Sequence, residues 1–481
     1  MDKAKMIFGN PLSDRDYKKA VKGAESYRKK FGDDSKVEYH LTTADNNVLE
    51  TFGAKNLVLT PGANMAFDDK AVVIGNIRMG FGHYRISMAM ASAAQALGYK
   101  PLWFDLHSFK DTTCGKVIRH QNDLYSLGSR LSQKSFLFNL FWEYENSEGF
   151  RKLTYNAADQ KKAELMAPLA RALPKDIPYV ATHVWPAQAA VHAGLTNVVN
   201  AIPDNWPMAL HLAEGAKHTI QTPSSFLGYK SLRGMAKHPL KPMPQGSLFY
   251  TGHYIDHELV TNIEADNAQR IDRLNTGAPR RYLMTVGGAG AQQDLFIGMI
   301  EKLLPDIEAG RATLLMNFGD HRTVFDTICG KVPAFKALAQ THFDDYDGAK
   351  RFAEAALTGP VTGIHAFYDA DIFAAVYITN LLMRCSDVLI TKPSELAYYP
   401  IPKLMIKRVG GHEAWGAIRT AEIGDGTYEC RTMPEIGAML DLLTNDGEVL
   451  SSMCKAIETG KSIGLYDGAY NVIKLAAEGT F

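Results

Sequence analysis

Cysteine is scarce in this chain, with 5 residues among 481. None of the cysteines forms a C-x-x-C pair, and their wide spacing excludes the common zinc-binding motifs and a disulfide framework. We expect the thiols to be buried as small apolar side chains. The five positions are Cys114, Cys329, Cys385, Cys430 and Cys454.

The chain also lacks an excess of charge of one sign and any long apolar run. Lys plus Arg equals Asp plus Glu at 52 each, which argues against the broad basic surface of nucleic-acid-binding proteins. No stretch reaches the roughly 18 apolar residues of a membrane-spanning helix. The first residues lack the apolar core of a signal peptide. We therefore expect a cytoplasmic protein without a nucleic-acid partner.

The composition is otherwise that of a globular protein, with 46% hydrophobic and 22% charged residues. The chain is longer than one hydrophobic core usually supports, which predicts two domains. One apolar run, FLFNLFW at residues 136–142, suggests a lipid surface. Peripheral contact with the inner membrane surface is one interpretation of this run, and a buried helix is the other.

Two segments have a strand, glycine turn and helix in succession. In the first, an apolar strand at 72–77 precedes a turn with Gly80 and Gly82, and a helical pattern follows at 86–97. In the second, a strand at 281–286 precedes a turn at 287–292 and a helix. Strands that alternate with helices indicate parallel sheets. Two such starts predict an α/β protein with two Rossmann-like, doubly wound domains that face a central cleft.

The predicted organisation has five parts. They are an N-terminal α/β appendage at 1–70, a first Rossmann-like domain at 71–250, a linker at 251–280, a second Rossmann-like domain at 281–455 with an insertion at 319–363, and a C-terminal segment at 456–481 that packs back on the first domain.

The first glycine turn is followed directly by His83. This histidine could act as a base, as an oxyanion donor or as a structural residue at a helix start. Ligands in open α/β sheets bind at the carboxyl ends of strands, which favours a chemical role. Arg85 occupies the position of the third glycine in a dinucleotide-binding turn, while Asp105 lies where a ribose-binding acid would. A nicotinamide-dependent enzyme is therefore an alternative.

The second glycine turn, GGAGA at residues 287–291, has the composition of a phosphate-binding loop. Its small residues leave backbone N–H groups free to face a diphosphate at a helix N-terminus. A tight turn without any ligand is the alternative interpretation.

Acidic residues after three other predicted strands are further candidates. Asp204 lies in the loop IPDNWP, where it could serve as a general base or as a turn former. Glu395 follows Lys392 after one late strand, and Glu413 ends a glycine turn after the next. A carboxylate there could accept ribose hydroxyls, and solvated loop charges are the alternative.

Three motifs together resemble glycosyltransferases of the GT-B fold. They are GFGH at 80–83, GGAGA at 287–291, and SDVLITKPSE at 386–395 with GGHEAWG at 410–416. The resemblance is strongest to the branch of monogalactosyldiacylglycerol synthases, processive diacylglycerol glucosyltransferases and the N-acetylglucosaminyltransferase of peptidoglycan synthesis. It extends motif by motif over residues 71–455. The segment after Lys392 departs from the family, because it continues without the family's K-P-G-G spacer.

The resemblance implies roles for individual residues. His83 and Asp204 would be catalytic, with Gly80 and Gly82 in the acceptor-side loop. The implied donor-binding residues are Gly288, Gly290, Ala291, Lys392, Glu395, Gly411, His412 and Glu413.

The resemblance also implies an activity. A bacterial-type hexosyltransferase would move a hexose from a nucleotide-diphosphate sugar, with a UDP-sugar favoured, to an acceptor hydroxyl of a lipid or a glycan. The reaction would invert the anomeric centre and require no metal or other cofactor. One alternative is a catalytically inactive GT-B-like protein that binds a nucleotide or a sugar, and the other is the nicotinamide-dependent oxidoreductase.

Overall fold

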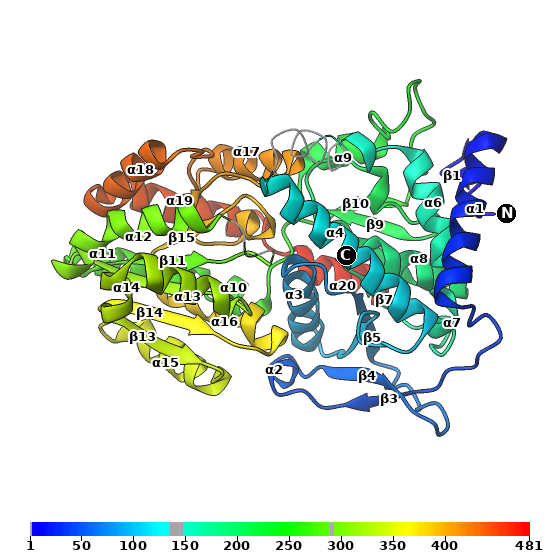
Figure 1. The fold of residues 1–481 in the computed structure, drawn as a ribbon, viewed down its shortest axis with the longest axis horizontal. Coiled ribbons are helices and arrows are strands. Elements are labelled where there is room, and N and C mark those ends of the chain that lie inside the picture. The colour runs from blue at the N-terminus through cyan, green and yellow to red at the C-terminus, as the bar shows by residue number, and fades with distance from the viewer. Residues whose placement is uncertain (1, 135–143, 145–147, 289, 291) are drawn as a thin grey trace.

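The computed structural model of the chain describes residues 2–134, 144, 148–288, 290 and 292–481. Two α/β halves lie side by side, each built on its own sheet (Figure 1). This confirms the predicted fold class of two Rossmann-like domains. The apolar run at 136–142 lies outside the described residues. No helix in the part of the chain that is described has the length and hydropathy needed to cross a membrane.

The first sheet has eight strands in the order β10-β9-β8-β7-β5-β6-β4-β3. All neighbours are parallel except β3 and β4, which pair antiparallel. The order reverses between β5 and β7, so the topological switch point lies there. The strands are β3 (Leu41–Ala44), β4 (Lys55–Leu59), β5 (Ala71–Asn76), β6 (Lys100–Asp105), β7 (Tyr179–Ala181), β8 (Val198–Ala201), β9 (Lys217–Ile220) and β10 (Leu248–Tyr250).

Helices cover both faces of this sheet. They include α1 (Asp14–Phe31), α2 (Asn47–Glu50), α3 (Gly82–Ala96), α4 (Thr113–Lys134), α6 (Leu153–Ala163), α7 (Ala167–Ala170), α8 (Val184–Ala193), the 3-10 helix η2 (Ala209–His211) and α9 (Pro223–Lys230). Alternate residues of β5 point to opposite faces, as a strand requires. Val72 and Ile74 pack in a cluster with α3, whereas Ala71 and Val73 pack in a cluster with α4, α7 and α8.

The second sheet has six parallel strands in the order β13-β14-β12-β11-β15-β16, with its switch point between β11 and β15. The strands are β11 (Arg280–Thr285), β12 (Ala312–Asn317), β13 (Ala339–Phe343), β14 (Gly363–Tyr368), β15 (Val388–Thr391) and β16 (Lys403–Met405). The helices are α10 (His257–Thr261), α11 (Ile263–Asn275), α12 (Gln293–Glu308), α13 (Arg322–Lys331), α14 (Pro333–Leu338), α15 (Tyr346–Thr358), α16 (Ile372–Cys385), η3 (Glu395–Tyr398), η4 (Gly411–Glu413), α17 (Ala414–Ile423), α18 (Met433–Asn445) and α19 (Gly447–Ser462).

The segments outside the two predicted Rossmann units attach to these sheets. From residues 1–70, β3 and β4 extend the edge of the first sheet, α1 packs against α6, and β1 (Met6–Ile7) pairs with β2 (Asn10–Pro11). From residues 319–363, β13 forms the edge of the second sheet. The final helix, α20 (Gly468–Ala477), packs against α3 of the first half, as its place beside α3 in Figure 1 shows.

The chain crosses between the halves at residues 251–256 and again at 463–468, and the two crossings touch. His253 N donates to the carbonyl of Leu465 at 2.7 Å. A Cβ on Gly468 would lie 2.2 Å from the carbonyl oxygen of Gly252, so only glycine allows this approach. The two crossing segments therefore pack against each other and connect the halves at one place.

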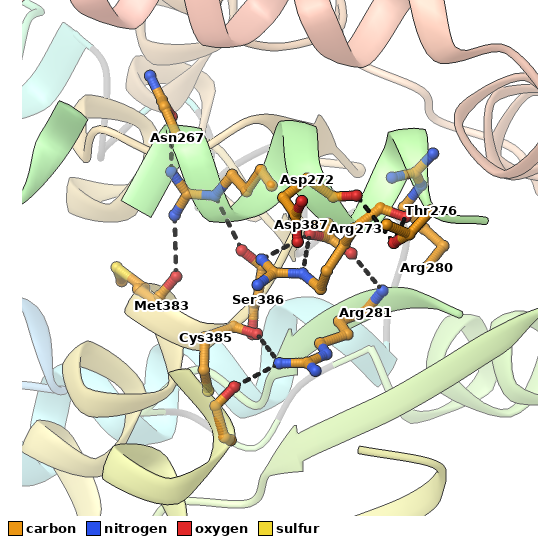
Figure 2. Close-up of polar contacts among 12 residues, drawn as sticks. Asn267, Asp272, Arg273, Thr276, Arg280, Arg281, Met383, Cys385, Ser386 and Asp387 are labelled. Carbon is orange, nitrogen blue, oxygen red and sulfur yellow. Dashed lines mark hydrogen bonds and ion pairs between the residues drawn. The ribbon is translucent and has the colours of Figure 1, made fainter. Parts of the chain in front are cut away.

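Buried arginines stabilise the second half at the end of the sheet opposite the strands' carboxyl ends (Figure 2). Arg273 donates through Nε to Oδ1 of Asp387 at 2.9 Å, and the backbone N of Arg281 donates to Oδ2 at 2.8 Å. Arg270 donates to the carbonyls of Ser386 and Met383 at the end of α16. Arg270 thus satisfies helix-end carbonyls that would otherwise lack partners.

We predict that Asp387→Ala destabilises the protein by about 3–5 kcal/mol, because it leaves the buried Arg273 charge without its partner. Asp326→Ala is the matched control, since its ion pair with Arg322 is exposed and should change stability by less than about 0.5 kcal/mol. Urea denaturation followed by circular dichroism measures both. Equal effects of the two substitutions would contradict the prediction.

Candidate active site

A cavity of about 580 Å³ lies between the two halves. Although α4 and the start of α6 also contribute, most of its lining comes from segments that follow β5, β7 and β8 in the first half and β11, β15 and β16 in the second. These are the carboxyl ends of strands that flank both topological switch points. Ligands of doubly wound sheets bind at such points, and here two of them face a single cavity.

His83 lies in the first turn of α3 and lines the cavity. Its Nδ1 is 2.7 Å from the carbonyl oxygen of Thr182. Because a carbonyl only accepts, Nδ1 carries the proton and Nε2 keeps its lone pair. Burial lowers the pKa of His83 below its ordinary value, although the Thr182 contact and the Asp204 charge oppose this. The imidazole is therefore neutral near pH 7 and able to accept a proton.

Asp204 lies in the loop after β8, with its Oδ2 3.1 Å from Nε2 of His211. Burial alone would raise the pKa of Asp204, but the hydrogen bond from His211 and the interactions with His412 and His83 in their protonated forms hold it well below its usual range. The carboxylate is thus ionised throughout the physiological pH range.

His183 is a second histidine beside His83 that the sequence analysis missed. It is the N-cap of α8, and its Nδ1 accepts a hydrogen bond from the backbone N of Trp185 at 3.1 Å. Its ring meets that of His83 edge-to-face, with centroids 4.7 Å apart. Burial lowers the pKa of His183 well below its ordinary value. Its position shortly after the apolar residues of β7 was the available sequence signal. His211, in a separate 3-10 helix, had no such signal.

The two predicted glycine turns come from different halves and contact each other at the cavity. A Cβ on Gly288 would lie 2.6 Å from the Cα of Gly80, and one on Gly319 would lie 2.5 Å from the ring of Phe81. Backbone of the second turn therefore packs directly on backbone of the first. An ion pair between Arg78 and Asp320 joins the halves at the same place.

In the second half, Glu413 is engaged by its own loop. Its carboxylate accepts from the backbone N of Val409 at 2.7 Å and of Gly410 at 3.2 Å, and it forms an ion pair with Lys392. Burial raises the pKa of Glu413, but Lys392 and His412 lower it more, so the net change is downward. Glu413 therefore holds the loop that presents His412, whose Nδ1 is buried without a hydrogen-bond partner in the described structure.

Glu395 turns toward the first half. Its Oε1 is 3.5 Å from Nε of the buried Arg85, and a Cβ on Gly82 would lie 3.0 Å from its Oε2. Arg85 also donates to the carbonyl of Val376 and to Asn380 on α16. The predicted ribose contact of Glu395 stays a prediction, and its observed partner is this arginine at the interface.

Asp105 is fully engaged inside the first half. One carboxylate oxygen accepts from the hydroxyl of Tyr84 at 2.7 Å and the other from the backbone N of His107 at 2.8 Å. Burial raises the pKa of Asp105 to about 6. The nicotinamide alternative therefore lacks a free ribose-binding acid at this position.

Most of the predicted site residues meet at one place. Those that line the cavity are Gly80, Gly82, His83, Asp204, Gly288, Lys392, Glu395, His412 and Glu413. Gly290 and Gly411 lie beside this lining, and Ala291 is outside the described residues. Among the residues that the structure describes, no group of three or more His, Cys, Asp or Glu side chains is arranged to hold a metal ion.

Two family models match the chain. Residues 6–231 match a domain of unknown function, DUF6937. Residues 243–477 match a second domain of unknown function, DUF6938. The border between the two matches lies just before β10, the last strand of the first sheet. No curated protein matches the chain significantly in sequence.

Solved structures with a similar arrangement include two kinds of enzyme. UDP-GlcNAc 2-epimerase from Neisseria meningitidis, bound to UDP-GlcNAc, has a TM-score of 0.46 at 12% identity, over 85% of this chain and 99% of that one. The α,α-trehalose-6-phosphate synthase from Burkholderia multivorans has a TM-score of 0.42 at 9% identity, over 85% and 98%. Similarity at this level carries no inference about activity. The resemblance to the monogalactosyldiacylglycerol synthase branch stays a prediction.

We predict that Gly288→Ala separates the two glycine turns, because its Cβ would meet the backbone of Gly80. Hydrogen exchange of the amides at 78–83 should then be faster. Gly437→Ala is the matched control, since its Cβ would meet only Lys302 at an ordinary distance of 3.7 Å. Unchanged exchange in Gly288→Ala would show that the turns do not depend on this contact.

Proposed function

We propose that this protein is a hexosyltransferase that moves a sugar from a nucleotide-diphosphate donor to an acceptor hydroxyl. The observation that carries the proposal is the placement of His83 and Asp204 in one cavity that Gly287 and Gly288 of the second glycine turn also line. The lowered pKa values of His83 and Asp204 favour a neutral imidazole and an ionised carboxylate there. A UDP-sugar donor, inversion at the anomeric carbon and independence of a metal are further parts of the proposal, and they rest on the motif resemblance.

His83 is the better candidate for the base. A general base works best when its pKa lies near the working pH, and the strongly lowered pKa of Asp204 makes that carboxylate a weak base. The charge of Asp204 raises the pKa of His83. In this assignment His83 takes the proton through Nε2, and Asp204 stabilises the imidazolium that results.

The reaction is a single displacement. The acceptor hydroxyl gives its proton to Nε2 of His83 while its oxygen forms a bond to the anomeric carbon of the donor. The bond from this carbon to the diphosphate oxygen breaks, and its electron pair stays on the diphosphate. Backbone N–H groups of Gly287 and Gly288, the N-terminus of α12 and the charge of Lys392 would stabilise this leaving group.

We predict that one nucleoside diphosphate raises the melting temperature, since a ligand at a hundred times its Kd stabilises by about 2.7 kcal/mol. UDP, GDP, ADP, TDP and their sugars form the panel. With the donor that binds, His83→Ala should lower kcat about 10²- to 10⁴-fold. The exposed His238→Ala is the control.

The outcomes separate the possible functions. No stabilisation by any nucleotide would count against the transferase. Binding without hydrolysis or transfer would favour the inactive binding protein. Full activity of both His83→Ala and Asp204→Asn would refute the assigned roles.

The proposal also predicts a pH dependence. His83 must be neutral to accept a proton, and its folded pKa lies below 6.5. The value of kcat/KM should therefore rise with pH in the range below 6.5 and be constant above it. Asp204→Asn removes a charge that raises the pKa of His83, so this rise should move to lower pH. A rise that stays in place in Asp204→Asn would contradict the coupling.

A further inference from the structure

A chain of polar contacts leads from Asp204 into the first half. Nε2 of His211 is 3.1 Å from Oδ2 of Asp204, and Nδ1 of His211 is 2.7 Å from the hydroxyl of Tyr229 on α9. The Asp204 side chain is 33% exposed, His211 is 5% exposed, and Tyr229 is fully buried. Two buried groups, His211 and Tyr229, thus support the Asp204 carboxylate at the cavity.

Hydrogen-bond accounting shows which nitrogen of His211 carries a proton. The Tyr229 hydroxyl accepts from the backbone N of Met208 at 3.3 Å, and it has one proton to donate, either to Nδ1 of His211 or to the carbonyl of Trp206. If Nδ1 receives it, Nε2 carries the hydrogen. If Trp206 receives it, Nδ1 must be protonated, and an ionised Asp204 then requires a proton on Nε2 as well. Nε2 donates to Asp204 in both cases.

The backbone holds His211 in this orientation. Its carbonyl oxygen accepts from Nδ2 of Asn200 at 2.6 Å, and Asn200 is a buried residue of β8. Asp204 follows β8 by a few residues, so the same strand positions both the donor and the acceptor of the bond. The pair needs little rearrangement during a reaction, which is what preorganised electrostatic stabilisation requires.

We propose that His211 and Tyr229 are a positioning pair that holds Asp204 ionised and aimed at the reacting centre. The inference rests on the proposed function, because it gives the charge of Asp204 a role in transfer. His211 and Tyr229 act through Asp204 and do not themselves react.

The charged and titratable groups around Asp204 come from several elements. His83 faces it from α3, His412 from η4 and His211 from η2, while His183 lies at the start of α8. Glu395 acts on His83 from η3. Of these groups, His211 forms the hydrogen bond to the Asp204 carboxylate.

The test compares two substitutions of the same histidine. His211→Gln can keep an N–H donor near the position of Nε2, whereas His211→Leu removes it. We expect His211→Leu to lower kcat about tenfold to a hundredfold, as loss of a hydrogen bond to a charge does, and His211→Gln to restore most of the activity. His192→Leu is the matched control, since His192 is a half-buried histidine of the same half that also uses its Nε2 in a hydrogen bond.

NMR measurements test the pair without any turnover. In ¹⁵N-histidine-labelled wild-type protein, His211 should carry its proton on Nε2. In ¹³C-aspartate-labelled protein, with Asp204→Asn used to assign the signal, the pKa of Asp204 should rise in His211→Leu and in Tyr229→Phe. It should stay unchanged in His192→Leu.

The readouts distinguish the two proposals. An unprotonated Nε2 of His211, or an Asp204 titration that His211→Leu and Tyr229→Phe leave unchanged, would overturn the positioning pair. A protein that shows the expected titrations but transfers no sugar would overturn the proposed function and leave the Asp204–His211 coupling intact. If His211→Leu does not fold, the Asp204 titration in Tyr229→Phe and the tautomer of His211 in the wild-type protein still test the positioning pair.

Discussion

The direct contact between the two glycine turns sets the geometry of the whole cavity. A Cβ on Gly288 would lie 2.6 Å from the Cα of Gly80. There is therefore no space for a side chain between the two backbones. The carboxyl ends of β5 and β11 are therefore held together. His83 lies in the helix that starts at the first turn, and α12 begins shortly after the second. His83 and the start of α12 are thus brought to one cavity by two residues that have no side chain.

Buried polar groups complete the joint between the halves. Arg85 on α3 reaches Glu395 and Asn380 of the second half, and Asn380 in turn donates to Asp256 at 3.0 Å. Buried charges are costly unless they are paired, so this arrangement favours one relative placement of the two sheets. The residue that replaces the third glycine of a dinucleotide-binding turn is therefore a structural link.

Much of the fold could be predicted from local patterns. The buried strand at 71–76 and the helix after it are visible because apolar residues alternate or recur along a short stretch. The edge strands β3 and β13 are short and half-polar, so their membership of the sheets was not visible. The site divides in the same way. His83 and Asp204 could be found because each follows a strand. His183 also follows a strand, but its contact with His83 was not visible in the sequence. His211 and Tyr229 join the site through contacts between elements that periodicity does not relate.

The amino-acid sequence by itself determined two α/β halves, their glycine turns and the candidate base, because each depends on residues that are neighbours in the chain. Only the tertiary structure decided which side chains form hydrogen bonds with each other and which charged groups lie close together. The pKa of Asp204 depends on histidines from three other elements, and the carboxylate of Glu413 is saturated by its own loop and Lys392. Electrostatic interactions and hydrogen bonds act over a few ångströms in space, whatever the separation along the chain, so no local pattern records them.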